Sequence, residues 1–194
     1  GSDGNYYELE VNALETEWDL LLLKPYHDGR KVAVDSWDIP GLITKVHIDG
    51  TLNDPSDRDI GWSVEIAIPW KALEECAPNK IPLDGEQWKV NFSRVQWDVE
   101  IQGGGYVKTD SPEFNWVWSP QGLIYMHMPD LWGMVQFSHA PAGGDDIVKF
   151  NESKDDLIRL ALRRVYWRES NYFLKYKKYT ASLKKLNLLD KPVA

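Results

Sequence analysis

The sequence predicts a mainly β protein: an antiparallel β-sandwich followed by a C-terminal α-helical appendage. Short segments with alternating apolar and polar residues recur through the first 140 residues, and clusters of Gly, Pro, Asn and Asp separate them. After a run of Ala, Pro and Gly at 140–144, the apolar spacing changes from two residues to the three or four of a helix. We therefore expect a sandwich at 1–140, a linker at 141–150 and a basic helical appendage at 151–194.

The first half of the chain predicts a hairpin and then two further strands. Residues 6–13 alternate strictly, so Leu9 and Val11 share one face while Glu8 and Glu10 share the other. We expect the apolar face to point inward and the glutamates to point to solvent. The expected elements are strands at 6–13 and 17–24, a long loop at 24–41, strands at 43–48 and 62–69, and a helical turn at 70–76.

The second half predicts fewer strands and then a helix. Asn151 or Ser153 can cap the helix, and Asp155 and Asp156 suit its first turn because carboxylates favour the positive end of the helix dipole. The expected elements are one long strand at 87–97, a loop at 102–119, a strand at 132–138, a helix from about 153 to about 178 and a short helix at 182–188.

Charge and composition exclude several classes of protein. Residues 1–150 carry 25 acidic and 11 basic side chains, whereas residues 151–194 carry 5 and 11, within a formal net charge of −8. An acidic body argues against a nucleic-acid ligand, because phosphate binding needs a basic surface. Cys76 is the single cysteine, which excludes an intrachain disulfide and a cysteine zinc cluster. The longest apolar run has four residues, so no membrane-spanning helix is expected.

The tryptophan content indicates a ligand-binding surface. Ten tryptophans are present and nine lie at or before position 132, more than a core of this size needs. Sugars are bound by aromatic faces that stack on pyranose C–H groups and by polar side chains that hydrogen-bond the hydroxyls. Both kinds of residue gather where the strand at 87–97 ends and in the following loop, a usual place for binding residues. The candidate ligand-binding residues are Arg94, Trp97, Asn115, Trp116, Trp118, Gln121 and His127.

A structural role stays open for several aromatic residues. Alternation alone assigns core or strand-covering positions to Trp62, Trp70, Trp88 and Trp132. One of Trp116 and Trp118 can likewise cover the core. Arg94 can pair with Glu8 or Glu10 on a neighbouring strand instead of meeting a ligand.

Four segments in this order carry a family resemblance. They are NYYELEVN at 5–12 with Trp18-Asp19, GWSVEIAIPW at 61–70, VNFSRV at 90–95, and Trp118-Ser-Pro120 leading to PDLWG at 129–133. Together they resemble the family 9 carbohydrate-binding modules, β-sandwich domains of the DOMON-like group. The resemblance implies non-catalytic binding of a mono-, oligo- or polysaccharide in a polysaccharide-degrading system. It also implies an extracytoplasmic location, whether secreted, periplasmic or at the cell surface.

The chain departs from that family pattern at the N-terminus and at the sugar site. Such modules begin several strands before the position of Tyr6, so we expect the missing strands on an N-terminal segment or on another chain. The family binds sugar between two tryptophans, one of which belongs to those missing strands. The second would fall near residues 125–127, where this chain has no tryptophan. The resemblance therefore implies the ligand class without transferring the family's binding pair.

A loop at 49–59 raises the question of calcium. Carboxylates that converge from one loop can supply the oxygens that calcium prefers, and family 9 modules often bind this ion. Asp and Asn are also ordinary turn-forming residues, so a purely structural loop stays open. The weak candidate ligands are Asp49, Asp54, Asp57 and Asp59.

Three other functions remain as alternatives. Some DOMON-like domains hold b-type haem between Met and His, and this chain contains Met126-His127-Met128, with His47 and Met134 elsewhere. A structural accessory domain without a ligand site is the second alternative. Catalysis is the third, but neither Glu65 nor Glu113 has a recognisable partner carboxylate and no hydrolase or nucleotide motif is present. The sequence therefore gives no basis for assigning a catalytic activity.

Overall fold

The computed structural model describes residues 4–28, 32–121, 125–144 and 147–188. Over these residues the chain is mainly β, with five small antiparallel sheets and one C-terminal α-helix, which confirms the coarse fold class. None of the sheets closes, so the sandwich stays a prediction. The chain divides into two compact units, residues 1–139 and 140–194, which are described separately below.

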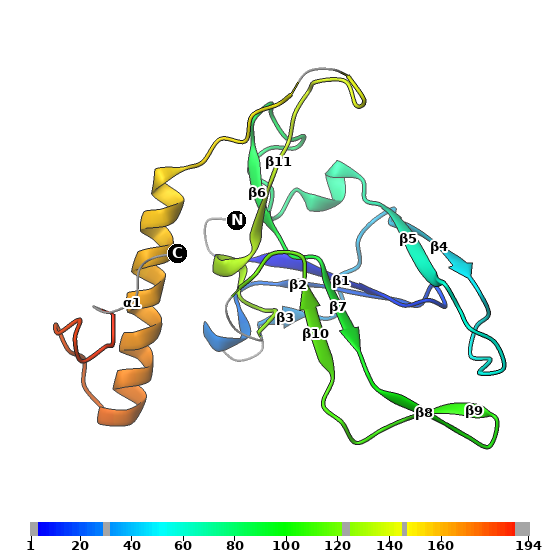
Figure 1. Cartoon of the computed structure of the whole chain (residues 1–194). Helices are drawn as coiled ribbons and strands as arrows, with labels where there is room; N and C mark the ends of the chain where they lie inside the picture. The colour runs from blue at the N-terminus through cyan, green and yellow to red at the C-terminus, as the bar shows by residue number, and fades with distance from the viewer. Residues whose placement is uncertain (1–3, 29–31, 122–124, 145–146, 189–194) are drawn as a thin grey trace. The chain divides into compact units, whose positions relative to one another are not determined.

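The strand unit consists of short elements (Figure 1). The strands are β1 (Tyr6–Val11), β2 (Glu17–Leu22), β3 (Ala33–Val34), β4 (Ile43–Asp49), β5 (Gly61–Ala67), β6 (Gln87–Val90), β7 (Ser93–Gln96), β8 (Val99–Gln102), β9 (Gly105–Lys108), β10 (Phe114–Val117) and β11 (Gly133–Gln136). Short 3-10 helices are interspersed among the described strands: η1 (Tyr26–Asp28), η2 (Trp70–Leu73) and η3 (Pro129–Leu131).

The β1–β2 hairpin contains the buried apolar core. Leu20 and Leu22 are fully buried and lie opposite Glu8 and Tyr6 in the antiparallel register, and Val32 completes the cluster. The even-numbered face of β1 is therefore the inner one, and Glu8 lies on it. The expectation that Glu8 faces solvent is wrong, because burial of the two leucines of β2, rather than the apolar side chains of β1, decides which face turns inward.

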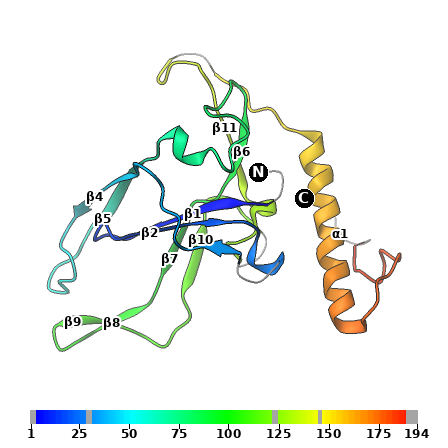
Figure 2. The same ribbon diagram turned by 180° about the vertical axis from the view of Figure 1, so that it is seen from behind.

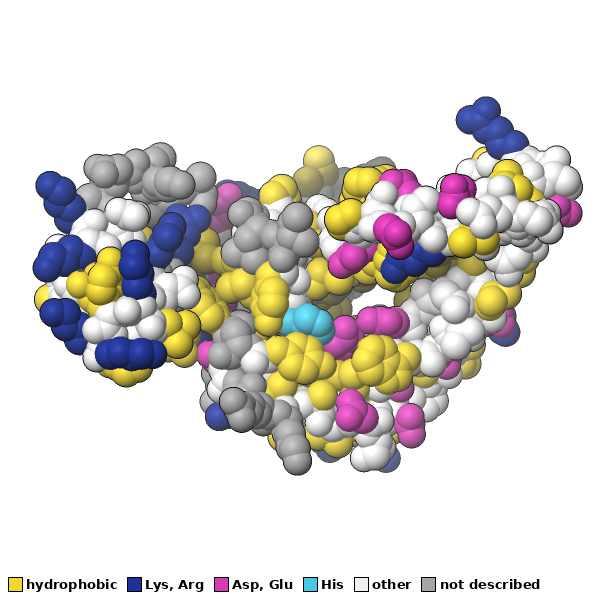
Figure 3. Space-filling model, turned by 90° about the horizontal axis from the view of Figure 1, so that it is seen from below, with side chains coloured by type: hydrophobic (Ala, Val, Ile, Leu, Met, Phe, Trp, Pro, Cys, Tyr) yellow, Lys and Arg dark blue, Asp and Glu magenta, His cyan; other side chains and the backbone are white. Residues whose placement is uncertain are grey.

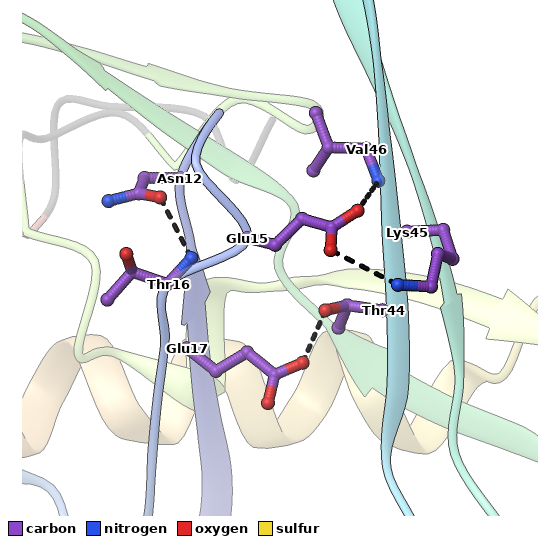
Figure 4. Close-up of polar contacts among 7 residues, drawn as sticks. All are labelled: Asn12, Glu15, Thr16, Glu17, Thr44, Lys45 and Val46. Atoms are coloured by element: carbon purple, nitrogen blue, oxygen red, sulfur yellow. Dashed lines mark hydrogen bonds and ion pairs between the residues drawn. The ribbon is translucent and has the colours of Figure 1, made fainter.

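The turn of this hairpin attaches to the next sheet (Figure 4). Asn12 Oδ1 accepts a hydrogen bond from the Thr16 amide at 3.0 Å, which closes the turn. The Glu15 carboxylate accepts from the Val46 amide at 2.9 Å and from Lys45 Nζ at 3.1 Å. The Val46 bond is the main cause that lowers the pKa of Glu15. These bonds join the first hairpin to β4, which pairs with β5.

The predicted long strand at 87–97 is two strands with different partners. β6 pairs with β11, and β7 pairs with β10. The strand breaks at Asn91 and Phe92, where the chain passes from one pair to the other. Residues 102–119 are also not the single loop that their polar composition predicts. They include β9 and β10, and a two-residue Gly103-Gly104 turn with positive φ joins β8 to β9, as primed hairpin turns require.

Trp118 holds these two strand pairs together. Its amide donates to the carbonyl of Phe92 at 2.9 Å, and its indole Nε1 donates to the carbonyl of Val90 at 3.0 Å. The indole also lies against Gly133, the first residue of β11. A Cβ at Gly133 would come within 2.6 Å of Trp118 Cζ2, so this position accepts only glycine without a shift of the ring.

Several apolar strand faces are only partly covered. In Figures 1 and 2 the β4–β5 and β8–β9 hairpins extend as two-stranded arms. Trp62 and Ile66 share the apolar face of β5, yet 39% and 44% of their surfaces are exposed. On β8, Ile101 is 60% exposed. These exposures exceed those of an ordinary sheet packed on a core.

The C-terminal unit is built on α1 (Lys154–Tyr176), close to the predicted bounds. Ser153 is the N-cap residue, Asp155 and Asp156 lie in the first turn, and Lys177 ends the helix in a left-handed conformation. Basic side chains gather on this unit (Figure 3). The short helix expected at 182–188 is wrong: the described residues there form hydrogen-bonded turns. No helix among the described residues has the length and apolarity to cross a membrane.

We predict that Gly133→Ala destabilises the strand unit by about 1–3 kcal/mol, because the new methyl group collides with the Trp118 ring and with Cβ of Ser119. Gly105→Ala is the matched control, since Gly105 also begins a strand but a Cβ there meets nothing within 4 Å. Urea unfolding followed by circular dichroism measures both. Equal losses of stability in the two variants would contradict the packing role of Trp118.

Candidate functional site

The β7–β10 pair presents one continuous aromatic and polar face. In its register Arg94 lies opposite Trp116 and Gln96 lies opposite Phe114. Because side chains two residues apart share a face of a strand, these four project to the same side. The pairing extends one step further, where the rings of Phe92 and Trp118 lie 5.4 Å apart. We call this face the aromatic platform: Phe92, Arg94, Gln96, Phe114, Trp116 and Trp118.

The platform is open to solvent and its polar groups are held in place. Trp116 is 59% exposed. The Arg94 guanidinium lies over this ring, with Cζ 5.9 Å from the ring centroid, and Arg94 Nη2 donates to Gln96 Oε1 at 2.7 Å. Among the described residues, no carboxylate forms an ion pair with Arg94. The guanidinium therefore has further N–H donors available beside a flat aromatic surface.

Three of the seven candidate ligand-binding residues meet on this platform, namely Arg94, Trp116 and Trp118. Asn115 lies on the opposite face of β10 and is half-buried. Trp97 follows β7 at an odd-numbered position, and Lys108 Nζ lies 4.4 Å from its ring centroid. Gln121 is buried, and its amide atoms have no hydrogen-bond partner among the described residues. The sequence analysis did not predict Gln96, Phe114 or Phe92 as site residues. Once 114–117 is assigned as a strand paired with β7, their even-numbered positions place them on the same face as Trp116.

His127 lies in a second group of side chains. Its Nδ1 shares a hydrogen bond with Tyr6 Oη at 2.9 Å and lies 3.6 Å from Glu8 Oε2. The ring of Tyr26 meets the His127 ring edge-on at a centroid distance of 4.6 Å. Trp132 packs edge-on against Tyr6 at 5.0 Å. We call this group the Glu8 cluster: Tyr6, Glu8, Tyr26, His127 and Trp132.

Burial dominates the electrostatics of the Glu8 cluster. It raises the pKa of Glu8 from 4.5 to about 7, and repulsion from Glu10 adds to the rise. Burial also lowers the pKa of His127 and raises that of Tyr6. One carboxylate oxygen, Glu8 Oε2, is buried without a hydrogen-bond partner in the described part of the chain, because 3.6 Å to His127 exceeds hydrogen-bonding distance. No local signal in the sequence reveals Glu8, since alternation assigns it to the solvent face.

The loop considered for calcium uses its carboxylates internally. Asp59 accepts from the Thr51 amide at 2.7 Å, Asp57 accepts from Thr51 Oγ1 at 2.8 Å, and Asp54 accepts from the Ser56 amide at 2.9 Å. Asp49 ends β4. Over the described residues, no group of three or more His, Cys, Asp or Glu side chains is arranged to hold a metal ion. These contacts are those of a hydrogen-bonded polar turn.

Apart from the consecutive Met126-His127-Met128, the residues considered for haem and for catalysis lie in separate elements. Met128 is buried beside η3, Met134 lies on β11, and His47 is exposed on β4. Glu65 is exposed on β5 and Glu113 is exposed just before β10. The structure therefore assembles the aromatic platform and the Glu8 cluster, whereas these side chains stay distributed over the strand unit.

Comparisons of the chain with models of protein families, with curated proteins and with solved structures found no match in any of the three.

We predict that Glu8→Gln stabilises the protein at pH 8 by up to roughly 3 kcal/mol, because a pKa raised from 4.5 to about 7 disfavours the ionised carboxylate in the folded state. The sign follows from proton linkage. The folded state binds the Glu8 proton more tightly, so its contribution to stability is complete below pH 4.5 and is lost as the pH rises through 7. The gain from Glu8→Gln should therefore shrink towards pH 4.5. Urea unfolding at several pH values measures the difference, and a gain independent of pH would contradict the assignment.

Proposed function

We propose that this chain is a non-catalytic carbohydrate-binding module that holds a sugar chain on the aromatic platform. The observation that carries the proposal is the register of β7 and β10. It places the Arg94 guanidinium directly opposite the exposed indole of Trp116, with Gln96 and Phe114 as the next pair on the same face. Flat aromatic area with fixed polar groups at its edge suits a pyranose ring, which offers a C–H face and a rim of hydroxyls.

The binding mechanism follows from these two kinds of contact. Trp116 would stack on one face of a sugar ring, and Phe114 or Trp118 would support the neighbouring rings of a chain. Arg94, already oriented by Gln96, would donate to sugar hydroxyls or to the ring oxygen. An open face buries little ligand area, so we expect affinities in the micromolar to millimolar range, on the order of −4 to −8 kcal/mol.

The resemblance to family 9 modules supports the same ligand class and the finer fold. In this proposal the small sheets belong to a β-sandwich. The half-exposed apolar face of β5, with Trp62 and Ile66, is consistent with a sheet that has further partners. The proposal also includes the extracytoplasmic setting of a polysaccharide-degrading system, where a weak binding module keeps an enzyme near its polymer.

We predict that Trp116→Ala weakens binding to the preferred polysaccharide by about tenfold or more, because the variant removes the main stacking surface. Affinity gel electrophoresis with soluble xylan, glucan and mannan identifies the ligand, and calorimetry with oligosaccharides gives the constants. Arg94→Ala should weaken binding as well, through loss of the hydroxyl contacts.

Trp62→Ala is the matched control, because Trp62 is also a partly exposed strand tryptophan but lies on β5, away from the platform. It should leave sugar affinity unchanged. If the folded protein binds none of the sugars, or if Trp62→Ala and Trp116→Ala weaken binding equally, the platform is not the site. An absence of binding would favour an accessory domain without a ligand.

A further inference from the structure

When the Glu8 carboxylate is ionised, no Lys or Arg among the described residues pairs with it. Its side chain is 20% exposed, and within the described part of the chain its chargeable contact is His127 at 3.6 Å. His127 is poorly suited to neutralise it, because its Nδ1 is engaged with the Tyr6 hydroxyl and burial favours its neutral form. A buried charge is normally paired, and burial raises the pKa of this unpaired carboxyl group to about 7.

Aromatic rings surround this carboxylate. Tyr6 and His127 lie next to it, and Trp132 packs edge-on against Tyr6. Tyr26 packs edge-on against His127 and remains 40% exposed, so its ring is accessible from solvent. The π faces of tyrosine rings attract cations, and the attraction grows when a carboxylate lies nearby.

The other charges close to the cluster are also acidic. Electrostatic repulsion from Glu10, on β1, helps to raise the pKa of Glu8 and that of Tyr26. Repulsion from Asp35, just after β3, also raises the pKa of Tyr26, as do Glu8 and the hydroxyl of Tyr125. Each of these groups disfavours a further negative charge, and among the described residues His127 is the one basic side chain in contact with Glu8. The local field therefore favours a positively charged ligand.

We propose that the Glu8 cluster is a binding site for the ammonium group of a small organic cation, held between the ring of Tyr26 and the carboxylate of Glu8. The site is separate from the aromatic platform and does not depend on sugar binding there. A metal ion suits it less well, because the described residues offer no group of three His, Cys, Asp or Glu ligands. An ammonium group needs only one carboxylate and aromatic walls.

The test uses tetramethylammonium chloride as the probe and tert-butyl alcohol as its neutral analogue of similar shape, with sodium chloride added to equalise ionic strength. Titrations followed by NMR of the labelled protein at pH 8 should show saturable shifts at Tyr26 and His127 with the cation and none with the alcohol. Binding should strengthen as the pH rises through about 7, since Glu8 then ionises while His127 stays neutral.

Variants locate the site. Glu8→Gln should weaken binding by about tenfold or more, because it removes the charge and keeps the shape. Tyr26→Ala, at an exposed position, should weaken it as well without disturbing the core. Glu65→Gln is the matched control, a strand glutamate outside the cluster, and should have no effect. Trp116→Ala should also leave the cation affinity unchanged, which separates this proposal from sugar binding on the platform.

Three outcomes would overturn the proposal. The first is an absence of saturable shifts, which would mean that Glu8 takes up only a proton. The second is equal binding of the cation and the alcohol, which would make the site merely apolar. The third is retention of full affinity in Glu8→Gln and Tyr26→Ala, which would place the cation elsewhere. None of these outcomes bears on whether the platform binds sugars.

Discussion

The packing of Leu20 and Leu22 under β1 is the constraint on which the rest of the strand unit depends. These two side chains are fully buried, and with Tyr6 and Val32 they form the buried cluster to which Trp132 attaches. Burying them fixes the inner face of β1, and the same choice places Glu8 beside the core. The protein therefore keeps its first hairpin at the cost of burying one carboxylate, whose raised pKa reflects the low polarity around it.

A second constraint, strand register, builds the aromatic platform. A slip of one residue between β7 and β10 would move Trp116 to the opposite face and separate it from Arg94. Trp118 opposes such a slip, because its indole donates a hydrogen bond to the Val90 carbonyl and packs against Gly133. The exposed surface proposed to bind sugars thus depends on Trp118, which both packs the two strand pairs together and forms part of the platform.

The sequence predicted the elements that have strong local patterns. Alternation identified β1, β4 and β5, an apolar run after a short turn identified β2, and helical spacing with Ser153 and two aspartates identified α1. Prediction from the sequence failed where strand pairing in the folded protein overrides the local amino-acid composition. The segment at 102–119 contains three consecutive glycines and Pro112, which favour loops, yet pairing with β7 makes a strand of Phe114–Val117. It also could not foresee that His127 joins Glu8, since that contact links residues more than a hundred positions apart.

We propose above that the face shared by β7 and β10 binds carbohydrate. An NMR titration of the isotope-labelled protein with the oligosaccharide that it prefers, read as a map of amide and indole shifts, tests this directly. We expect shifts concentrated in residues 92–96 and 114–118, with the indole of Trp116 among the largest. Shifts confined to the β4–β5 hairpin or to α1, with the platform unchanged, would contradict it.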